Sequence, residues 1–263
     1  MSLFSGGVLL TGASGGIGQA IARAVAPRSG DLILSGRRRE ALEPLAAQLG
    51  ARGITSDLSL REEVERLVEE AGQVDVLIAN AGVAASGDLV DLAQDEIDRM
   101  LEVNLRAPVA LARALAPAML RRGRGHIVFV SSLQGKAATP LSSVYCATKF
   151  GLRGFALALR QDLRARGVGV SVVLPGFIRD AGMFAVSGAK LPLGVGTRSP
   201  EDVARAVIRA VERDRAQIEV APVGLRLGSS IASVAPALSA VVTRRLGSAR
   251  IAERIVAGQR GGG

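Results

Sequence analysis

The stretch Thr11-Gly12-Ala13-Ser14-Gly15-Gly16-Ile17-Gly18 decides the fold of this chain of 263 residues. It follows a short apolar run at residues 7–10 and leads directly into an amphipathic pattern at residues 17–26. Glycines at such a turn let the backbone approach a pyrophosphate at the positive N-terminus of a helix. The alternative is that these glycines form a simple turn between a strand and a helix and bind no ligand. Their position directly after the first strand and before a helix favours a nucleotide site.

Farther along the chain, short apolar runs alternate with longer amphipathic runs, which is typical of βαβ units. The predicted strands are residues 7–10, 31–35, 53–55, 74–80, 125–131, 168–174 and 218–221. The predicted helices are residues 17–26, 39–49, 60–71, 94–121, 143–166 and 200–213. This pattern predicts an α/β fold, a Rossmann-like doubly wound parallel sheet of about seven strands with helices on both faces. We expect a single catalytic domain at residues 1–222 and a C-terminal extension at residues 223–263.

The rare residue types exclude several classes of function. One cysteine, Cys146, excludes an internal disulfide framework and any site that needs several cysteines for zinc or iron–sulfur binding. One histidine, His126, disfavours a histidine metal cage or a histidine-centred triad, and we expect it to be structural. We therefore expect chemistry without a metal, based on hydroxyls, carboxylates, lysine, arginine or a cofactor.

Three consecutive arginines follow the second predicted strand, in Ser35-Gly36-Arg37-Arg38-Arg39. A site for NAD(H) normally carries a carboxylate at this point to bind the ribose diol. Guanidinium groups instead suit the 2′-phosphate of NADP(H). We expect Arg37 and Arg38 to bind this phosphate, so that NADP(H) is preferred to NAD(H); for Arg39 the start of a surface helix is the better interpretation.

The only tyrosine, Tyr145, precedes Lys149 by four residues. On a helix these two positions share a face, so the ammonium can lie beside the phenol. A nearby cation favours the phenolate and lowers the pKa of tyrosine, which makes it a usable acid or base. The alternative for the pair alone is a tyrosine at the edge of the core and a solvated lysine.

In these motifs the chain resembles the short-chain dehydrogenase/reductase family, in its subgroup with TGxxxGxG and YxxxK, over roughly residues 6–222. The matching motifs occur in the order of the family: Thr11–Gly18, Asp57-Leu58, Asn80-Ala81-Gly82, Asn104, Ser131-Ser132, Tyr145 with Lys149, and Pro175-Gly176. The resemblance implies an NADP(H)-dependent oxidoreductase that acts on a carbonyl or secondary alcohol, assembled as a homodimer or homotetramer. The alternative is a catalytically silent NADP(H)-binding regulatory protein of the same fold.

The resemblance also assigns roles to individual residues. It implies Tyr145 as general acid or base, Lys149 as the group that lowers its pKa and binds the ribose, and Ser132 as the group that holds the substrate oxygen. It implies that Asn104 binds a water that links Lys149 to solvent. The implied cofactor-binding residues are Thr11, Gly12, Ser14, Gly16, Ile17, Gly18, Arg37, Arg38, Asp57, Leu58, Asn80, Ala81, Gly82, Tyr145, Lys149, Pro175, Gly176 and Ile178.

One position departs from the pattern, because Asp180 stands where the family often has threonine. A carboxylate is repelled by a pyrophosphate, so either Asp180 faces away, paired with Arg179, or the loop takes a different path. The stretch 176–199 lacks a clear period and is predicted to be a lid. Its apolar residues either contact a hydrophobic substrate or simply close the lid: Phe177, Met183, Phe184, Val186, Leu191 and Leu193.

The net charge of +9 lies largely in the C-terminal extension, where six arginines and one glutamate give +5. Because this extension has no aromatic residue to stack bases, we expect no nucleic-acid partner. Its uncharged stretch, residues 227–242, is shorter than the roughly 20 residues of a spanning helix. We expect it to pack over the substrate cleft or against a partner subunit, with peripheral membrane contact as the alternative. No basic segment followed by an apolar one opens the chain, so we expect a cytoplasmic protein.

Overall fold

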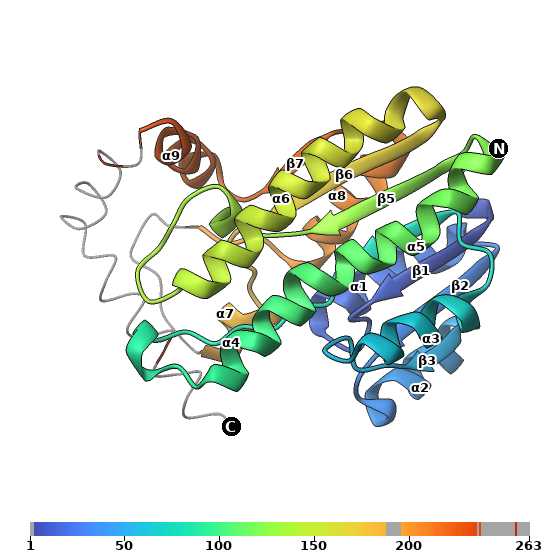
Figure 1. Cartoon of the computed structure of the whole chain (residues 1–263), viewed down its shortest axis with the longest axis horizontal. Coiled ribbons are helices and arrows are strands. Elements are labelled where there is room, and N and C mark those ends of the chain that lie inside the picture. The colour runs from blue at the N-terminus through green and yellow to red at the C-terminus, as the bar shows by residue number, and fades with distance from the viewer. Residues whose placement is uncertain (1–2, 188–195, 236, 238–255, 257–263) are drawn as a thin grey trace.

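The computed structural model describes residues 3–187, 196–235, 237 and 256, and its centre is a seven-stranded sheet in the order β3-β2-β1-β4-β5-β6-β7 (Figure 1). All neighbouring strands pair in parallel. The strands are β1 Gly7–Thr11, β2 Asp31–Gly36, β3 Arg52–Thr55, β4 Val76–Ala79, β5 Gly125–Val130, β6 Val168–Pro175 and β7 Gln217–Val220. The doubly wound fold predicted from the sequence is confirmed.

Helices cover both faces of this sheet, which explains why its strands are apolar on both sides. The helices are α1 Gly16–Val25, α2 Arg39–Leu49, α3 Arg61–Ala71, α4 Gln94–Leu101, α5 Ala107–Arg122, α6 Ser143–Leu163, α7 Gly182–Ser187, α8 Pro200–Glu212 and α9 Val223–Val234. Alternate side chains of β1 enter two separate cores. Val8 and Leu10 pack with α1, α2 and α8, whereas Leu9 packs with α3, α5 and α6.

The helix predicted over residues 94–121 is the main difference from the expected elements. A π-helical turn, Glu102–Arg106, separates α4 from α5. Such a turn inserts one extra residue into a helix and is common at functional sites. Here it contains Asn104, whose buried side chain bonds the backbone of Val83 instead of facing solvent. Hydrophobic periodicity does not reveal this irregularity.

Two segments that lacked a clear pattern contain short helices. The predicted lid includes α7, and the C-terminal extension begins with α9. Among the described residues, no helix is long and apolar enough to cross a membrane. Most of the extension after Val234, including Arg244 and Arg245, lies outside the described residues, so peripheral membrane contact through it stays a prediction.

The strand order places the glycine turn at the centre of the sheet. β1 pairs with β2 on one side and with β4 on the other, so the chain crosses over at β1. In an open α/β sheet a ligand binds in the crevice at such a point, beyond the carboxyl ends of the strands. The fold therefore brings the ends of β1, β4, β5 and β6 to one edge, where the motifs of the sequence meet.

Candidate active site

A cavity of about 1010 Å³ opens at the carboxyl ends of the strands. Residues that follow each of the seven strands line it. The residues predicted for the site that line it are Gly12, Ser14, Gly16, Ile17, Gly18, Arg37, Arg38, Asp57, Leu58, Asn80, Ala81, Gly82, Ser132, Tyr145, Lys149, Pro175, Gly176 and Ile178. The structure thus brings together motifs that are far apart in the sequence. Thr11 and Asn104 do not line the cavity; they are buried behind its wall.

The glycine turn after β1 is shaped by close backbone contacts. Gly12 has a positive φ of 68°, and a Cβ at this position would lie 2.7 Å from the Cα of Ala81. A Cβ on Gly18 would lie 2.1 Å from the carbonyl oxygen of Gly12. No side chain caps the N-terminus of α1, and its first turn lines the cavity. The turn therefore leaves the backbone donors of α1 available to an anion.

Thr11 and Asn80 tie the ends of β1 and β4 together. The Thr11 hydroxyl accepts hydrogen bonds from the backbone N–H groups of Asn80 and Ala81, each at 3.2 Å. The Asn80 amide donates to the carbonyl oxygens of Thr11 and Gly12, at 3.1 and 3.2 Å. These bonds fix the glycine turn against the neighbouring strand. Thr11 thus acts on the cavity through Asn80 and the backbone of the turn.

Charged groups gather at the β2 side of the cavity. Arg37 and Arg38 line it, and the Arg38 guanidinium donates to the carbonyl oxygen of Ser14 at 3.3 Å. Asp57 forms an ion pair with Arg99 of α4 at 3.2 Å. Burial alone raises the pKa of Asp57, but hydrogen bonds from Ser59 and Arg99 outweigh burial and keep this pKa below its ordinary value. Arg99 is not among the residues predicted for the site, because only the folded chain brings α4 beside the end of β3.

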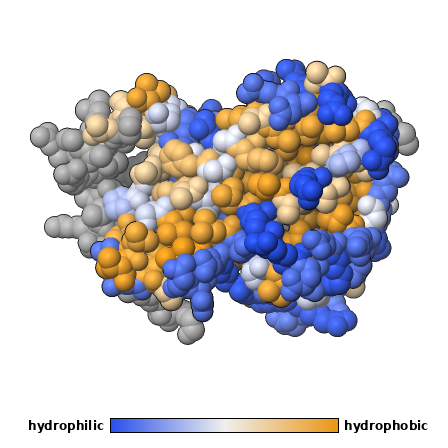
Figure 2. Space-filling view, viewed as in Figure 1, coloured by the Kyte–Doolittle hydropathy of each residue, from blue (hydrophilic) through white to orange (hydrophobic). Residues whose placement is uncertain are grey.

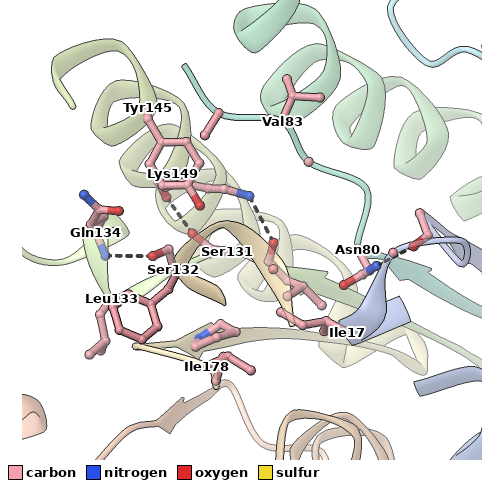
Figure 3. Close-up of a pocket in the computed structure, with 18 of the residues that line it drawn as sticks. Ile17, Asn80, Val83, Ser131, Ser132, Leu133, Gln134, Tyr145, Lys149 and Ile178 are labelled. Carbon is pink, nitrogen blue, oxygen red and sulfur yellow. Dashed lines mark hydrogen bonds between the residues drawn. The ribbon is translucent and has the colours of Figure 1, made fainter. Parts of the chain in front are cut away.

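Tyr145, Lys149 and Ser132 meet at the opposite side of the cavity (Figure 3). Tyr145 and Lys149 lie one turn apart on α6, and both are buried. The Lys149 Nζ atom lies 5.6 Å from the centre of the tyrosine ring and donates to the carbonyl oxygen of Val130 at 3.3 Å. The Ser132 hydroxyl accepts a hydrogen bond from the backbone N–H of Gln134 at 3.1 Å. The predicted helical pairing of phenol and ammonium is therefore present in the fold.

The protonation states differ from the expectation that Lys149 lowers the pKa of Tyr145. Burial raises the pKa of the Tyr145 phenol above its ordinary value, and the nearby Ser132 hydroxyl opposes this only in part. Burial also lowers the pKa of the Lys149 ammonium to about 8. The reason is that removal from water disfavours each charged form. At neutral pH the phenol is protonated and can serve as a proton donor.

Asn104 organises the wall behind Lys149. Its side-chain oxygen accepts from the backbone N–H of Val83, and its amide donates to the carbonyl oxygen of Val83, both at 2.8 Å. The amide also lies 3.3 Å from the Thr148 hydroxyl on α6. A Cβ on Gly82 would lie 3.4 Å from both the Asn104 oxygen and the Lys149 Nζ. Asn104 thus holds the segment after β4 against α6, and its contact with a water stays a prediction.

The single histidine and the single cysteine of the chain, His126 and Cys146, lie in the protein interior. His126 is buried in β5, where its Nε2 lies 2.8 Å from the Ser171 hydroxyl, and burial lowers its pKa to about 4. Cys146 is also buried, with its sulfur 3.9 Å from the Thr139 hydroxyl. Neither residue lines the cavity. The contacts of both agree with a structural role.

The lid region places Asp180 away from the cavity. Its side chain is 77% exposed and pairs with Arg179 at 3.6 Å, and its backbone has a positive φ of 64°. Of the two alternatives for Asp180, the structure shows the one in which it faces away. Phe177 and Phe184 line the cavity with ring centres 5.1 Å apart. The other apolar lid positions lie outside the described residues, wholly or in their side chains: Met183, Val186, Leu191 and Leu193.

Comparisons with known proteins agree with this geometry. Residues 7–191 match the family model for short chain dehydrogenase. The ketoacyl reductase HetN of Nostoc sp. is 36% identical over 222 residues, which cover 81% of this chain and 77% of that protein. Dehydrogenase/reductase SDR family member 7B of Xenopus laevis is 35% identical over 254 residues, which cover 88% of this chain and 78% of the relative.

Solved structures of short-chain dehydrogenases are also similar to this chain. A short-chain dehydrogenase from Sphingobium yanoikuyae in complex with NADPH has a TM-score of 0.76 and 28% identity, over 88% of this chain and 94% of the other. A metagenomic short-chain oxidoreductase in complex with NADP has a TM-score of 0.71 and 33% identity, over 84% of this chain and 99% of the other. The chain therefore belongs to the short-chain dehydrogenase/reductase family of oxidoreductases.

Proposed function

We propose that the protein is an NADP(H)-dependent oxidoreductase that transfers a hydride between the nicotinamide and a carbonyl or secondary alcohol. The observation that carries this proposal is one cavity that contains both the glycine turn of α1 and the group Ser132, Tyr145 and Lys149. A protein that only binds a dinucleotide has no need for a buried phenol beside a hydroxyl and an ammonium. For this reason we favour an enzyme over a catalytically silent regulatory protein.

The residues around the glycine turn fit a dinucleotide. A Cβ on Gly12 would collide with the backbone of Ala81, and one on Gly18 with the backbone of Gly12, so both glycines are needed for the tight turn; the uncapped first turn of α1 provides donors for a pyrophosphate. Asp57 and Leu58 would border the adenine, and Asn80, Gly82 and Ile178 would border the remainder of the cofactor. The bound nicotinamide supplies the hydride, and the protein supplies orientation and the proton.

The protein groups at the other side of the cavity manage the proton. The Tyr145 phenol, whose pKa burial raises, is in the form that donates a proton to a carbonyl oxygen. Ser132 would hold the same oxygen by a hydrogen bond. Lys149 would bind the nicotinamide ribose, and its charge would stabilise the phenolate that remains after proton transfer. In the oxidation direction the phenolate would accept the proton of the alcohol.

Arg37 and Arg38 support NADP(H) rather than NAD(H). Both line the cavity at the carboxyl end of β2, where a carboxylate would favour NAD(H). The Ser35 hydroxyl beside them is buried and has no hydrogen-bond partner among the described residues. The two related structures in complex with NADPH and NADP also support this choice.

We further propose a homodimer or homotetramer. Figure 2 shows apolar surface spread over α5 and α6, and Phe150 of α6 is 40% exposed. Large apolar patches on a soluble protein commonly mark contacts between subunits. Sedimentation velocity tests this part of the proposal, and a monomer at micromolar concentration would contradict it.

The experiment for the reaction is a screen of ketones, aldehydes and alcohols with the purified protein. We expect carbonyl-dependent oxidation of NADPH, or alcohol-dependent reduction of NADP⁺, without an added metal. NADH and NAD⁺ are run at equal concentrations, and we expect slower turnover with both. Tight binding of NADPH without turnover of any substrate would favour the regulatory alternative.

A further inference from the structure

A short helical turn, Leu133–Gly135, carries the Ser132 hydroxyl at its start. The carbonyl oxygen of Ser132 accepts a hydrogen bond from the backbone N–H of Gly135 at 2.9 Å. At the other end, the backbone N–H of Lys136 donates to the carbonyl oxygen of Leu133, also at 2.9 Å. These bonds make the turn one unit, so a contact that holds Lys136 also holds Ser132.

The side chain of Lys136 is anchored outside the cavity lining. Its ammonium donates to the Glu219 carboxylate of β7 at 2.6 Å and to the Ser230 hydroxyl at 2.7 Å. The side chains of Lys136 and Glu219 are 9% and 11% exposed. A buried charge is costly unless it is paired, so each of these two groups fixes the place of the other.

From Glu219 the hydrogen bonds continue to the helix that carries Tyr145. The Gln217 amide donates to the Glu219 carboxylate at 3.0 Å. The oxygen of the same amide accepts from the Arg153 guanidinium at 2.8 Å. Arg153 lies on α6, one turn after Lys149. One series of hydrogen bonds thus connects the turn after β5, the edge strand β7 and α6.

The turn also packs directly against α6. A Cβ on Gly135 would lie 2.5 Å from the carbonyl oxygen of Lys149. The Ser131 hydroxyl, just before the turn, donates to the same carbonyl oxygen at 2.9 Å. Contact at a single place would leave the turn free to pivot against the helix. Lys136 supplies the second point of support.

The polar side chains of β7 have no evident reason in folding stability. Strands covered by helices on both faces are normally apolar on both faces. On β7, Ile218 and Val220 pack in the core with α1 and α8, whereas Gln217 and Glu219 alternate with them on the opposite face. A buried ion pair adds little stability compared with an apolar pair of the same size. Its hydrogen bonds, however, have a preferred direction, which apolar contacts lack.

We infer that Lys136, Glu219, Gln217 and Arg153 form a positioning network that holds the turn of Ser132 in register with the helix of Tyr145. The inference rests on the proposed function, in which both hydroxyls act on one substrate oxygen. The four residues do not line the cavity, so they act through the turn and α6 and not on the substrate.

The test compares Lys136→Met with Arg160→Met. Arg160 is a matched control on α6, because its side chain is 11% exposed and pairs with Asp214 at 2.6 Å, but it contacts neither the turn nor β7. Both variants should lose stability in urea, since each leaves a carboxylate without its partner. For the best carbonyl substrate, kcat of Lys136→Met should fall by about tenfold to a hundredfold, because a small misplacement of a reacting group is costly.

Other kinetic constants separate positioning from folding. In Lys136→Met we expect KM for the carbonyl and the dissociation constant for NADPH to stay within about threefold of the wild type. Arg160→Met should keep the wild-type kcat. A kcat of Lys136→Met within about threefold of the wild type would overturn the inference.

A double variant removes the unpaired charge. Lys136→Met combined with Glu219→Gln leaves no buried carboxylate alone, and the new amide still accepts from Gln217. We expect part of the lost stability to return while kcat stays low. Recovery of kcat together with stability would show that the pair only supports folding, and would overturn the inference.

A measurement without turnover separates this inference from the proposed function. Tyr145 is the only tyrosine of a chain without tryptophan, so the tyrosine band in near-ultraviolet circular dichroism reports on its surroundings alone. We expect Lys136→Met to change this band in the same direction as Ser132→Ala, and Arg160→Met to leave it unchanged. If the wild type reduces no carbonyl and the bands change as expected, the proposed reaction alone is refuted. A wild-type band in Lys136→Met would overturn the positioning role.

Discussion

The single histidine allows a clean test of how burial controls charge in this fold. His126 lies in the interior of β5, and its Nε2 contacts the Ser171 hydroxyl at 2.8 Å. That hydroxyl donates to the carbonyl oxygen of Arg215 at 2.6 Å, so it accepts a hydrogen bond from the Nε2–H group of His126. Burial lowers the pKa of His126 from 6.5 to about 4; the Asp214 carboxylate raises it and Arg160 lowers it.

The direction and size of the effect follow from these values. Between pH 6.5 and about 4 the unfolded chain binds a proton on this residue that the folded chain does not bind. The free energy of unfolding therefore decreases as the pH falls through this window. The lowered pKa corresponds to about 3 kcal/mol, at about 1.4 kcal/mol for each pH unit. Because His126 is the only histidine, no other histidine titrates in the same range.

The assay is urea unfolding of the wild type and His126→Gln at pH values across the window. Glutamine carries an amide donor and has no charge to gain. We expect the variant to be less stable at neutral pH, but to lose about 3 kcal/mol less on acidification. Proton NMR of the single imidazole supplies an independent pKa. Equal pH dependence in the two proteins, or an imidazole that titrates near pH 6.5, would refute the reasoning.

Three further predictions concern the site. Lys149→Met should abolish turnover. It should also raise the free energy of unfolding at neutral pH by up to about 3 kcal/mol, because it removes a buried ammonium whose pKa is lowered to about 8. A lower stability of the variant in urea would contradict this. Replacing Arg37 and Arg38 together by alanine should weaken NADPH binding by about tenfold to a hundredfold and change NADH binding little, as titration of cofactor fluorescence would reveal. Gly18→Ala should lower stability and NADPH affinity, because its Cβ would lie 2.1 Å from the Gly12 carbonyl oxygen; a wild-type melting temperature would speak against this.

Local sequence signals predicted the sheet because each strand is short, apolar and followed by a helix pattern. The glycine turn and the spacing of Tyr145 and Lys149 are also local, and they place these residues on the first helix and on α6. The ends of parallel strands meet at one edge, so the positions of the motifs along the chain already implied a common crevice. The cavity contains most of the predicted residues for this reason.

Features that depend on contacts between distant segments could not be predicted in the same way. The ion pair of Asp57 and Arg99 joins the end of β3 to α4, and Lys136 reaches Glu219 across 83 positions of sequence. The pKa of Tyr145 was expected to fall because Lys149 is near. It rises because the fold buries the phenol, and the spacing of two residues contains no information on burial.

The central claim is that the Tyr145 phenol transfers the proton in a hydride-transfer reaction. The most direct test is kcat/KM of Tyr145→Phe for the best carbonyl substrate, together with its dissociation constant for NADPH. Phenylalanine keeps the ring and removes only the hydroxyl. Our account predicts that kcat/KM falls by about a thousandfold while NADPH affinity changes by less than about threefold. A variant that binds NADPH normally and retains near wild-type turnover would contradict the account.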